Sequence, residues 1–151
     1  MARESTGEGV LRGLHVLEYP YKRSLGPVLG RFFTALRDRQ LLGIRTRSGR
    51  VLVPPAEYDP ETGEALDELV PVGPGGEVVS WCWVARPRPK QPLAHPFAYA
   101  LIRLDGADAP LLHAVDAGTE ARLRTGARVR PRWAPDPRGG ILDIACFELA
   151  E

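Results

Sequence analysis

Five short apolar runs, each bounded by proline, glycine or aspartate, fill the second half of the chain and limit the folds open to it. They span residues 77–86, 97–106, 110–116, 127–135 and 141–149. Runs of this length between turn-forming residues are typical of β-strands, and no convincing helical period interrupts them. Five such strands closing on one another form a small barrel of the OB type. The sequence therefore predicts a mainly β protein with a five-stranded OB-fold barrel over residues 73–151.

Composition agrees with a turn-rich fold and limits the size of the protein. The chain has 151 residues, with 16 glycines and 15 prolines, and this length suits one domain with a small appendage. Residues 1–18 are small, polar and glycine-rich at first, which predicts a flexible N-terminus. Residues 19–72 are expected to hold one helix and a turn-rich docking segment ahead of the barrel.

Charge and hydropathy argue against several classes of partner. The 20 basic and 19 acidic residues nearly cancel, so the overall field gives no reason to expect a nucleic acid or a membrane partner. The first residues lack the apolar core of a signal peptide, and no apolar run approaches the roughly 20 residues that cross a bilayer. We therefore expect a cytoplasmic protein.

The segment 24–43 is the one convincing helix of the sequence. Ser24 can cap its start, Pro27 suits its first turn and Gly43 can end it. Apolar residues recur inside it at three- and four-residue spacing, which gives one apolar face.

The predicted helix and the extended segment before it expose candidate docking residues. Phe32 and Phe33 are adjacent and Leu36 follows at helical spacing, so the apolar face is wide. Such a face can bury against a second protein or cover this domain's own core, and the sequence leaves both readings open. Tyr19 and Tyr21 flank a proline in an extended segment and project to the same side. We predict that these five residues form a partner interface.

Aromatic and basic residues follow one another at the end of the first barrel strand. Trp81 and Trp83 share one strand face, and the proline-spaced loop after them contains Arg86, Arg88 and Lys90. Aromatic rings and cations at a barrel mouth can receive a ligand with phosphates and an adenine ring, or single-stranded nucleic acid. A tryptophan pair packed in the core, followed by a solvated basic loop, explains the same residues equally well.

The sequence shows no self-contained active site. His95 and His113 are the obvious candidates for acid–base work, but neither lies in a recognisable catalytic motif. The chain also has no phosphate-binding glycine loop and no nucleophile elbow. We expect no catalytic residue in this chain.

Side chains that commonly bind metals are also poorly placed. Cys82 and Cys146 are not spaced as a metal pair and lie in apolar runs, where a reduced cysteine acts as a small buried hydrophobe. Asp105 and Asp108 bracket a glycine in a turn and are expected to bond local backbone N–H groups.

The segment "RTRSGRVLVPPAEYDPETG", residues 45–63, has the layout of two metal-binding turns around a double proline but contains no cysteine and no histidine. We call these residues the ribbon segment. Four features follow one another along the chain: a leading helix, then the segments "GRVLVPP", "PFAYALIRLDGAD" and "LLHAVD". Over residues 18–150 the chain resembles the acyl-CoA-associated OB-fold family with a rubredoxin-like zinc ribbon, known as DUF35.

The resemblance implies that the ribbon of this chain is degenerate. The family's ribbon holds four cysteines, and this chain has Thr46, Ser48 or Gly49, Asp59 and Thr62 near those places. These residues cannot reproduce the thiolate ligands of tetrahedral zinc, so we expect no zinc and no other metal. We predict that Asp59 and Thr62 close their turn by hydrogen bonds from side chain to backbone instead.

The resemblance also implies a partner and a reaction. Members of the family dock on thiolase-like proteins beside the path of the acyl-CoA. This chain looks most like those of bacterial steroid side-chain degradation, the chemistry of cholesterol catabolism. There a lipid-transfer-protein-like aldolase subunit cleaves a β-hydroxyacyl-CoA. We expect a non-catalytic but required subunit of such a lyase, in a heterotetramer, with Arg86, Arg88, Lys90 and Trp83 binding the CoA.

Two questions stay open at the level of the sequence. A stand-alone OB-fold module that binds CoA esters or single-stranded nucleic acid is the alternative function. In some relatives the barrel follows a hydratase domain, so this chain is either a separate subunit or a domain of such a fusion.

Overall fold

The computed structural model describes residues 4–6 and 10–150 of the chain. Its first elements are the strands β1 (Glu4–Thr6) and β2 (Val10–Arg12), the helix α1 (Pro27–Arg37) and the strands β3 (Leu42–Arg45), β4 (Val51–Leu52) and β5 (Leu69–Pro71). The strands β6 (Gly76–Val84), β7 (Phe97–Leu104), β8 (Leu111–Asp116), β9 (Arg128–Trp133) and β10 (Ile144–Leu149) follow. Two short 3₁₀ helices, η1 (Glu120–Arg122) and η2 (Ile141–Asp143), precede β9 and β10. Within the described ranges, every helix is too short or too polar to cross a bilayer.

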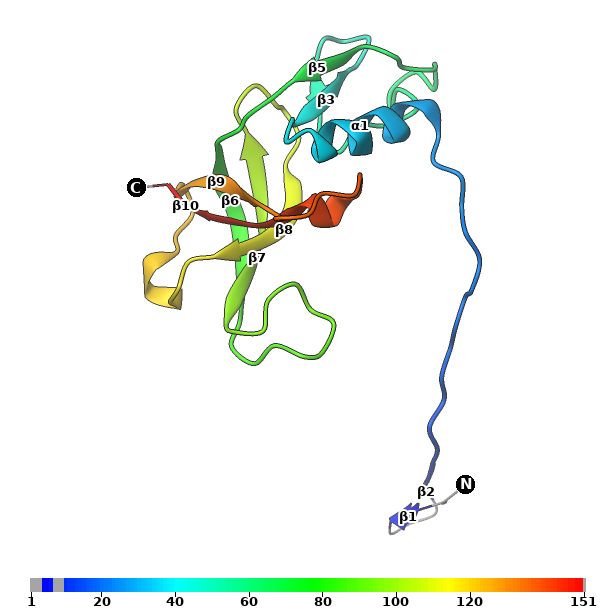
Figure 1. The fold of residues 1–151 in the computed structure, drawn as a ribbon, viewed down its shortest axis with the longest axis vertical. Coiled ribbons are helices and arrows are strands. Elements are labelled where there is room, and N and C mark those ends of the chain that lie inside the picture. The colour runs from blue at the N-terminus through cyan, green and yellow to red at the C-terminus, as the bar shows by residue number, and fades with distance from the viewer. Residues whose placement is uncertain (1–3, 7–9, 151) are drawn as a thin grey trace.

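The strands β6 to β10 close into a five-stranded barrel (Figure 1). Around it the strands follow the order β10-β8-β7-β6-β9, with β8 and β10 parallel and the other neighbours antiparallel. Each of the five predicted strands corresponds to one of these. The predicted fold class, a mainly β protein with an OB-fold barrel, is confirmed.

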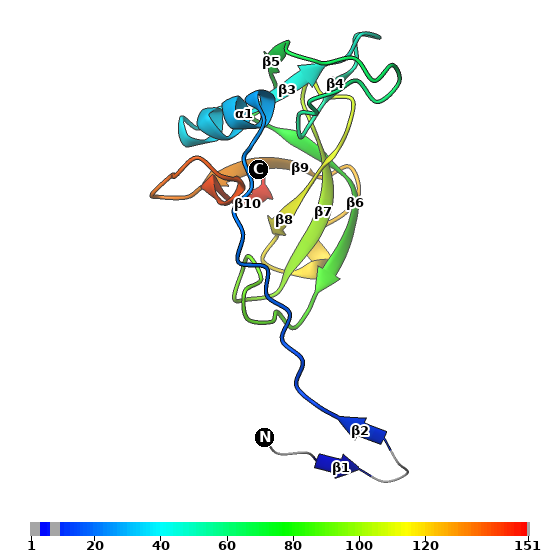
Figure 2. The same cartoon turned by 90° about the vertical axis from the view of Figure 1, so that its right-hand side faces the viewer.

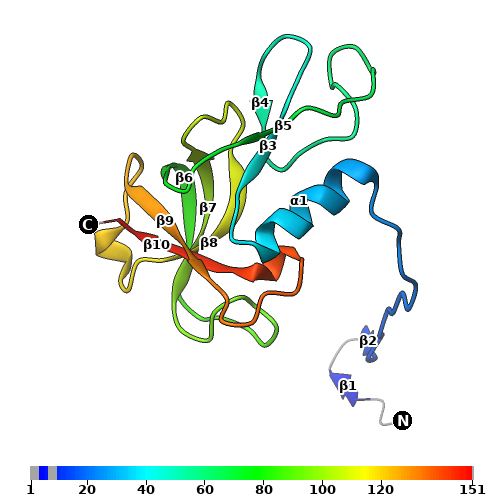
Figure 3. The ribbon, with the colours of Figure 1, turned by 45° about the horizontal axis from the view of Figure 1, so that its top comes forward.

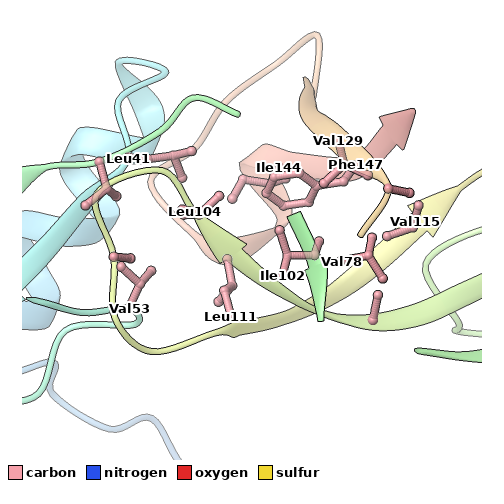
Figure 4. Packing of buried hydrophobic residues seen from close by; sticks show 14 of the residues in the cluster. Leu41, Val53, Val78, Ile102, Leu104, Leu111, Val115, Val129, Ile144 and Phe147 are labelled. Carbon is pink, nitrogen blue, oxygen red and sulfur yellow. The ribbon is translucent and has the colours of Figure 1, made fainter. Parts of the chain in front are cut away.

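Alternate residues of the barrel strands fill its interior. Val78, Ile102, Leu104, Val129 and Phe147 come from four different strands and are buried to within 1% of their surface (Figure 4). Because successive side chains of a strand point to opposite faces, each strand contributes every second residue to this core. Burial of one such side chain stabilises the fold by about 1.5–3 kcal/mol.

The helix α1 and the small sheet β4-β3-β5 lie together over one end of the barrel (Figures 1 and 3). Phe32 and Leu36 of α1 belong to the same buried cluster as the barrel residues. Val28, Ile44 and Leu66 form a second, smaller core between the helix and the sheet. The helix therefore packs on the barrel and on the small sheet at once.

The helix begins near the predicted residue but is capped and ended differently. Its N-cap residue is Gly26, which makes no side-chain cap, so the prediction for Ser24 is wrong. Gly43, predicted to end the helix, lies in β3. A Cβ atom at Gly43 would come within 2.5 Å of Val51 Cγ1. Close packing of neighbouring strands, rather than helix termination, therefore explains this glycine.

Residues 13–26, which we call the N-terminal arm, extend from the start of α1 past the far end of the barrel (Figures 1 and 2). Beyond the arm, β1 and β2 pair as a two-stranded sheet. The predicted flexible N-terminus, residues 1–18, includes residues 1–3 and 7–9, which lie outside the described residues. The arm exposes six large apolar side chains: Leu14, Val16, Leu17, Tyr19, Tyr21 and Leu25.

Candidate functional site

One buried carboxylate joins the two turns of the ribbon segment. Asp59 is 2% exposed. Its Oδ2 accepts a hydrogen bond of 2.8 Å from the N–H of Arg47 in the first turn. Its Oδ1 accepts bonds of 2.8 and 3.3 Å from the N–H groups of Glu61 and Thr62 in the second turn. Thr62 Oγ1 accepts a bond of 3.3 Å from the N–H of Glu64. The prediction that Asp59 and Thr62 close their turn is confirmed, and Asp59 also reaches the other turn.

The first turn is closed by hydroxyl groups. Thr46 Oγ1 accepts a hydrogen bond of 3.0 Å from the N–H of Arg50 and lies 3.1 Å from Ser48 Oγ. Two hydroxyl groups and one carboxylate, all engaged with the backbone or each other, do not fit the thiolate and imidazole ligands of a structural zinc. Across residues 4–6 and 10–150, no three His, Cys, Asp or Glu side chains gather closely enough to hold a metal ion.

The hydrogen bonds to Asp59 keep it ionised. The N–H groups of Arg47 and Glu61 lower the pKa of Asp59 more than burial of the side chain raises it, so the net pKa lies below the ordinary value. The carboxylate is therefore a charged acceptor that serves both turns at neutral pH.

Two further carboxylates connect the ribbon segment to its neighbours. Glu57 Oε1 lies 3.2 Å from the backbone N of both Val28 and Leu29, so the ribbon caps the start of α1. Asp108 Oδ2 accepts a bond of 2.8 Å from the N–H of Val51, and its own N–H donates to Val51 O at 2.8 Å. The prediction that Asp108 bonds its own turn is wrong, because its partner is 57 residues away.

Two other residues have surroundings that differ from those predicted. Asp105 pairs with Arg128 Nη1 at 2.8 Å rather than with local backbone, and Arg128 is the main cause that lowers the pKa of Asp105. Cys82 is exposed, because it points outward from β6, whereas Cys146 is buried as predicted. The closure of β6 against β9 brings Arg128 to Asp105, and a strand pattern alone does not reveal it.

The connection between β6 and β7, which contains the basic residues, lies at the end of the barrel opposite α1 (Figure 1). Trp81 and Trp83 are partly buried and pack against the barrel core. Arg86, Arg88 and Lys90 are exposed on the connection between β6 and β7. We call this connection, residues 85–96, the cationic loop. No ion pair among the described residues includes these three cations.

A charged cavity of about 340 Å³ lies on the barrel wall, lined by residues of β8, β9, β10 and the connection between β8 and β9. Both terminal nitrogens of Arg132 lie 3.1 Å from Asp116 Oδ2, and His95 Nε2 lies 3.1 Å from the same oxygen. Arg130 Nε pairs with Glu148 at 3.0 Å. This network leaves no signal in the sequence, because its members come from separate strands and one loop and share no local motif.

The other histidine considered for acid–base work, His113, is a structural residue. His113 is largely buried, and its ring meets the ring of Phe147 edge-on with centroids 5.5 Å apart. Burial is the main cause that lowers the pKa of His113, so the ring is neutral near pH 7. Its Nδ1 lies 3.5 Å from the carbonyl oxygen of Ala114. These contacts describe a packed core histidine rather than an acid–base catalyst.

The predicted interface residues separate into two groups. Phe32 and Leu36 are 1% and 0% exposed, so these two cover this chain's own core and are not available to a partner. Phe33 is partly buried against the same core. Tyr19 and Tyr21 are 68% and 67% exposed, and their rings pack edge-on with centroids 6.2 Å apart. The exposed tyrosine pair remains free for docking.

Comparisons with known proteins point to one family for the barrel. Residues 69–134 match the family model described as "ChsH2, C-terminal OB-fold domain". No curated protein matches the chain.

Two solved structures share the fold at low sequence identity. One is described as "Ltp2-ChsH2(DUF35) aldolase", with 19% identity, a TM-score of 0.62, and coverage of 86% of this chain and 100% of that chain. The other is a DUF35 protein of unknown function from Sulfolobus solfataricus, with 21% identity, a TM-score of 0.60, and coverage of 82% and 84%.

Proposed function

We propose that the chain is a member of the DUF35 OB-fold family and the non-catalytic subunit of a heteromeric acyl-CoA aldolase. The match of residues 69–134 to the ChsH2 barrel carries this proposal. A similar structure that is described as an aldolase of Ltp2 and ChsH2 supports it. In this proposal the partner is a thiolase-like, lipid-transfer-protein-like subunit, and the complex is a heterotetramer.

The reaction is a retro-aldol cleavage of a β-hydroxyacyl-CoA from a steroid side chain. A base removes the proton of the β-hydroxyl group, the bond between the α and β carbons breaks, and a carbonyl product leaves. The enolate of the shortened acyl-CoA then takes up a proton. In this proposal the base belongs to the partner, and His113, which is packed against Phe147, is not available for that role.

The proposed share of this chain is docking and ligand binding. Exposed Tyr19 and Tyr21 contact the partner, and the exposed cations Arg86, Arg88 and Lys90 attract the phosphates of CoA. The N-terminal arm supports this division, because it extends from α1 past the barrel end that carries the cationic loop (Figures 1 and 2). A partner that lies along the arm can therefore also reach the loop.

Co-expression with a thiolase-like aldolase subunit tests the proposal. We expect the two chains to co-purify in equal amounts, and we expect acyl-CoA cleavage, measured as release of the carbonyl product, to disappear when this chain is omitted. Separate elution of the two chains, with full activity of the partner alone, would refute the proposal. Salt-dependent binding of an oligonucleotide by the free chain would instead support a nucleic-acid module.

Substitution of the loop cations tests the ligand role within the same complex. We expect Arg86→Ala/Arg88→Ala to raise KM for the acyl-CoA about tenfold with little change in kcat, because two charge-assisted contacts to phosphate are lost. The matched control is Arg124→Ala/Arg138→Ala, which removes two exposed cations elsewhere on the barrel domain. Equal effects of both double variants would point to net charge rather than to a loop site.

A further inference from the structure

An apolar cluster lies on the outside of the barrel wall. Phe97, Ala114 and Cys146 are buried together, apart from the main core. They point outward, because their strand neighbours Ala98 and Val115 belong to the interior cluster and successive side chains of a strand alternate in direction. An outward-facing apolar cluster that is fully buried must be covered by another segment of the chain.

The cationic loop supplies that cover. Leu93 of the loop packs against the cluster of Phe97, Ala114 and Cys146, as does Val84, the residue just before the loop. Cys146 is 0% exposed although it lies on the outer face of β10. The loop therefore folds back onto the barrel wall.

A polar contact between His95 and Asp116 holds the loop at a second point, two residues after Leu93. His95 Nε2 lies 3.1 Å from Asp116 Oδ2. Burial alone raises the pKa of Asp116, but Arg132, the N–H of Gly118 and His95 outweigh it, so the net pKa is lowered. Asp116 is accordingly a fixed, ionised acceptor, and Arg132 orients it through two contacts of 3.1 Å.

The cations of the loop do not themselves hold it to the barrel. Arg86, Arg88 and Lys90 are exposed and lack carboxylate partners among the described residues. A local bond of 2.7 Å from the Arg88 N–H to Gln91 Oε1 shapes the loop but does not tie it to the barrel.

We infer that Leu93 and His95 are positioning residues, which hold the cationic loop against the barrel wall so that its three cations present one fixed site to an anionic ligand. The identity of that ligand as a CoA ester rests on the proposed function. The anchoring itself does not, because it is a property of the free chain.

Cys146 reports on the anchors directly. In a Cys82→Ser background, which removes the exposed thiol, Cys146 should react slowly with Ellman's reagent, because burial raises its pKa to about 11 and shields it. We expect Leu93→Ala and His95→Ala to increase the labelling rate at least about tenfold, through local opening of the loop. Leu93→Ile and His95→Gln should restore protection, because the first keeps the volume and the second keeps a donor to Asp116.

The controls separate local opening from general destabilisation. Two substitutions should leave the labelling rate unchanged. One is Leu112→Ala, at a residue of β8 that is 61% exposed, and the other is His15→Ala in the arm. Labelling is measured well below the melting temperature of each variant, so that global unfolding contributes little. An unchanged rate in both Leu93→Ala and His95→Ala would overturn the inference.

CoA-ester affinity of the partner complex tests the positioning role. We expect Leu93→Ala to weaken binding in the same direction as Arg86→Ala/Arg88→Ala, and Leu93→Ile to restore it. Weaker binding in the arginine variant with wild-type binding in Leu93→Ala would overturn the role. A wild-type complex that binds no CoA ester would refute the proposed function, whereas the labelling result would still decide whether the loop is anchored.

Discussion

At the scale of single residues, Asp59 shows how a ribbon without cysteines keeps its shape. A metal ion joins two turns because it binds both at once, and Asp59 does the same with hydrogen bonds from Arg47 on one side and Glu61 and Thr62 on the other. A buried carboxylate with three N–H donors is well satisfied. The turns are therefore held together by one side chain.

Replacement of Asp59 by asparagine should lower the melting temperature at pH 7 by about 5 °C or more, because the charged acceptor is lost and buried N–H groups bond less well. The pKa of Asp59 is lowered in the folded state, so its contribution is present above about pH 4 and is lost as the pH falls through the folded-state pKa. Asp59→Asn should therefore flatten the dependence of melting temperature on pH between about 5 and 3. Asp67→Asn, at an exposed carboxylate, is the control. If Asp59→Asn had the same dependence of melting temperature on pH as the wild type, Asp59 would not be the charged acceptor that joins the two turns.

At the scale of elements, α1 depends on the ribbon segment for its first turn. The helix has no side-chain cap of its own, and the Glu57 carboxylate accepts the N–H groups of Val28 and Leu29. A Cβ atom at Gly26 would lie 2.2 Å from Glu57 Oε1, so a glycine is needed for this approach. Helix and ribbon are consequently coupled through one contact.

Glu57→Ala should lower the free energy of unfolding by about 1 kcal/mol, since two N–H groups at the helix start lose their acceptor. Hydrogen exchange should accelerate at the amides of Val28 and Leu29 while the barrel amides stay protected. Glu57→Gln keeps an acceptor oxygen, so its free energy of unfolding should lie between those of the wild type and Glu57→Ala. Gly26→Ala should reproduce the effect of Glu57→Ala, because its Cβ atom displaces the carboxylate. Unchanged exchange at these two amides in Glu57→Ala would show that Glu57 does not cap the helix.

At the scale of the whole molecule, the apolar side chains divide between the folded body, which is the barrel with α1 and the small sheet, and the N-terminal arm. Phe32 and Leu36 close the body over the barrel end, whereas Tyr19 and Tyr21 lie on an arm that leaves the body (Figure 1). Truncation in the first group removes core packing, and truncation in the second group removes surface that the folded chain does not use. Stability and docking should therefore respond to different substitutions.

Tyr19→Ala/Tyr21→Ala should leave the melting temperature of the free chain unchanged and weaken the complex with the aldolase subunit by about 2 kcal/mol, roughly 30-fold in Kd. Leu36→Ala should instead cost the free chain about 3 kcal/mol of stability. Leu142→Ala, at a residue that is 79% exposed on η2, is the control for loss of an exposed apolar side chain. If the double tyrosine variant bound the partner with wild-type affinity, the two tyrosines of the arm would not be part of the interface.

Local patterns in the sequence determined the elements of this protein. Turn residues at regular intervals marked the five barrel strands, apolar spacing marked the helix, and the donor set of residues 45–63 indicated turns closed by Asp59 and Thr62. These signals are readable because a strand alternates every second residue and a helix repeats every 3.6, whatever the rest of the chain does.

Tertiary structure alone decided which distant residues meet. Several contacts join residues that are far apart in the chain. Glu57 binds the start of α1, Asp108 binds Val51, Arg128 binds Asp105, and both His95 and Arg132 bind Asp116. The burial of Phe32 and Leu36 was likewise undecided between this chain's core and a partner. Such contacts depend on strand register and on how the barrel closes, and these follow from packing of the whole molecule rather than from any short stretch of sequence.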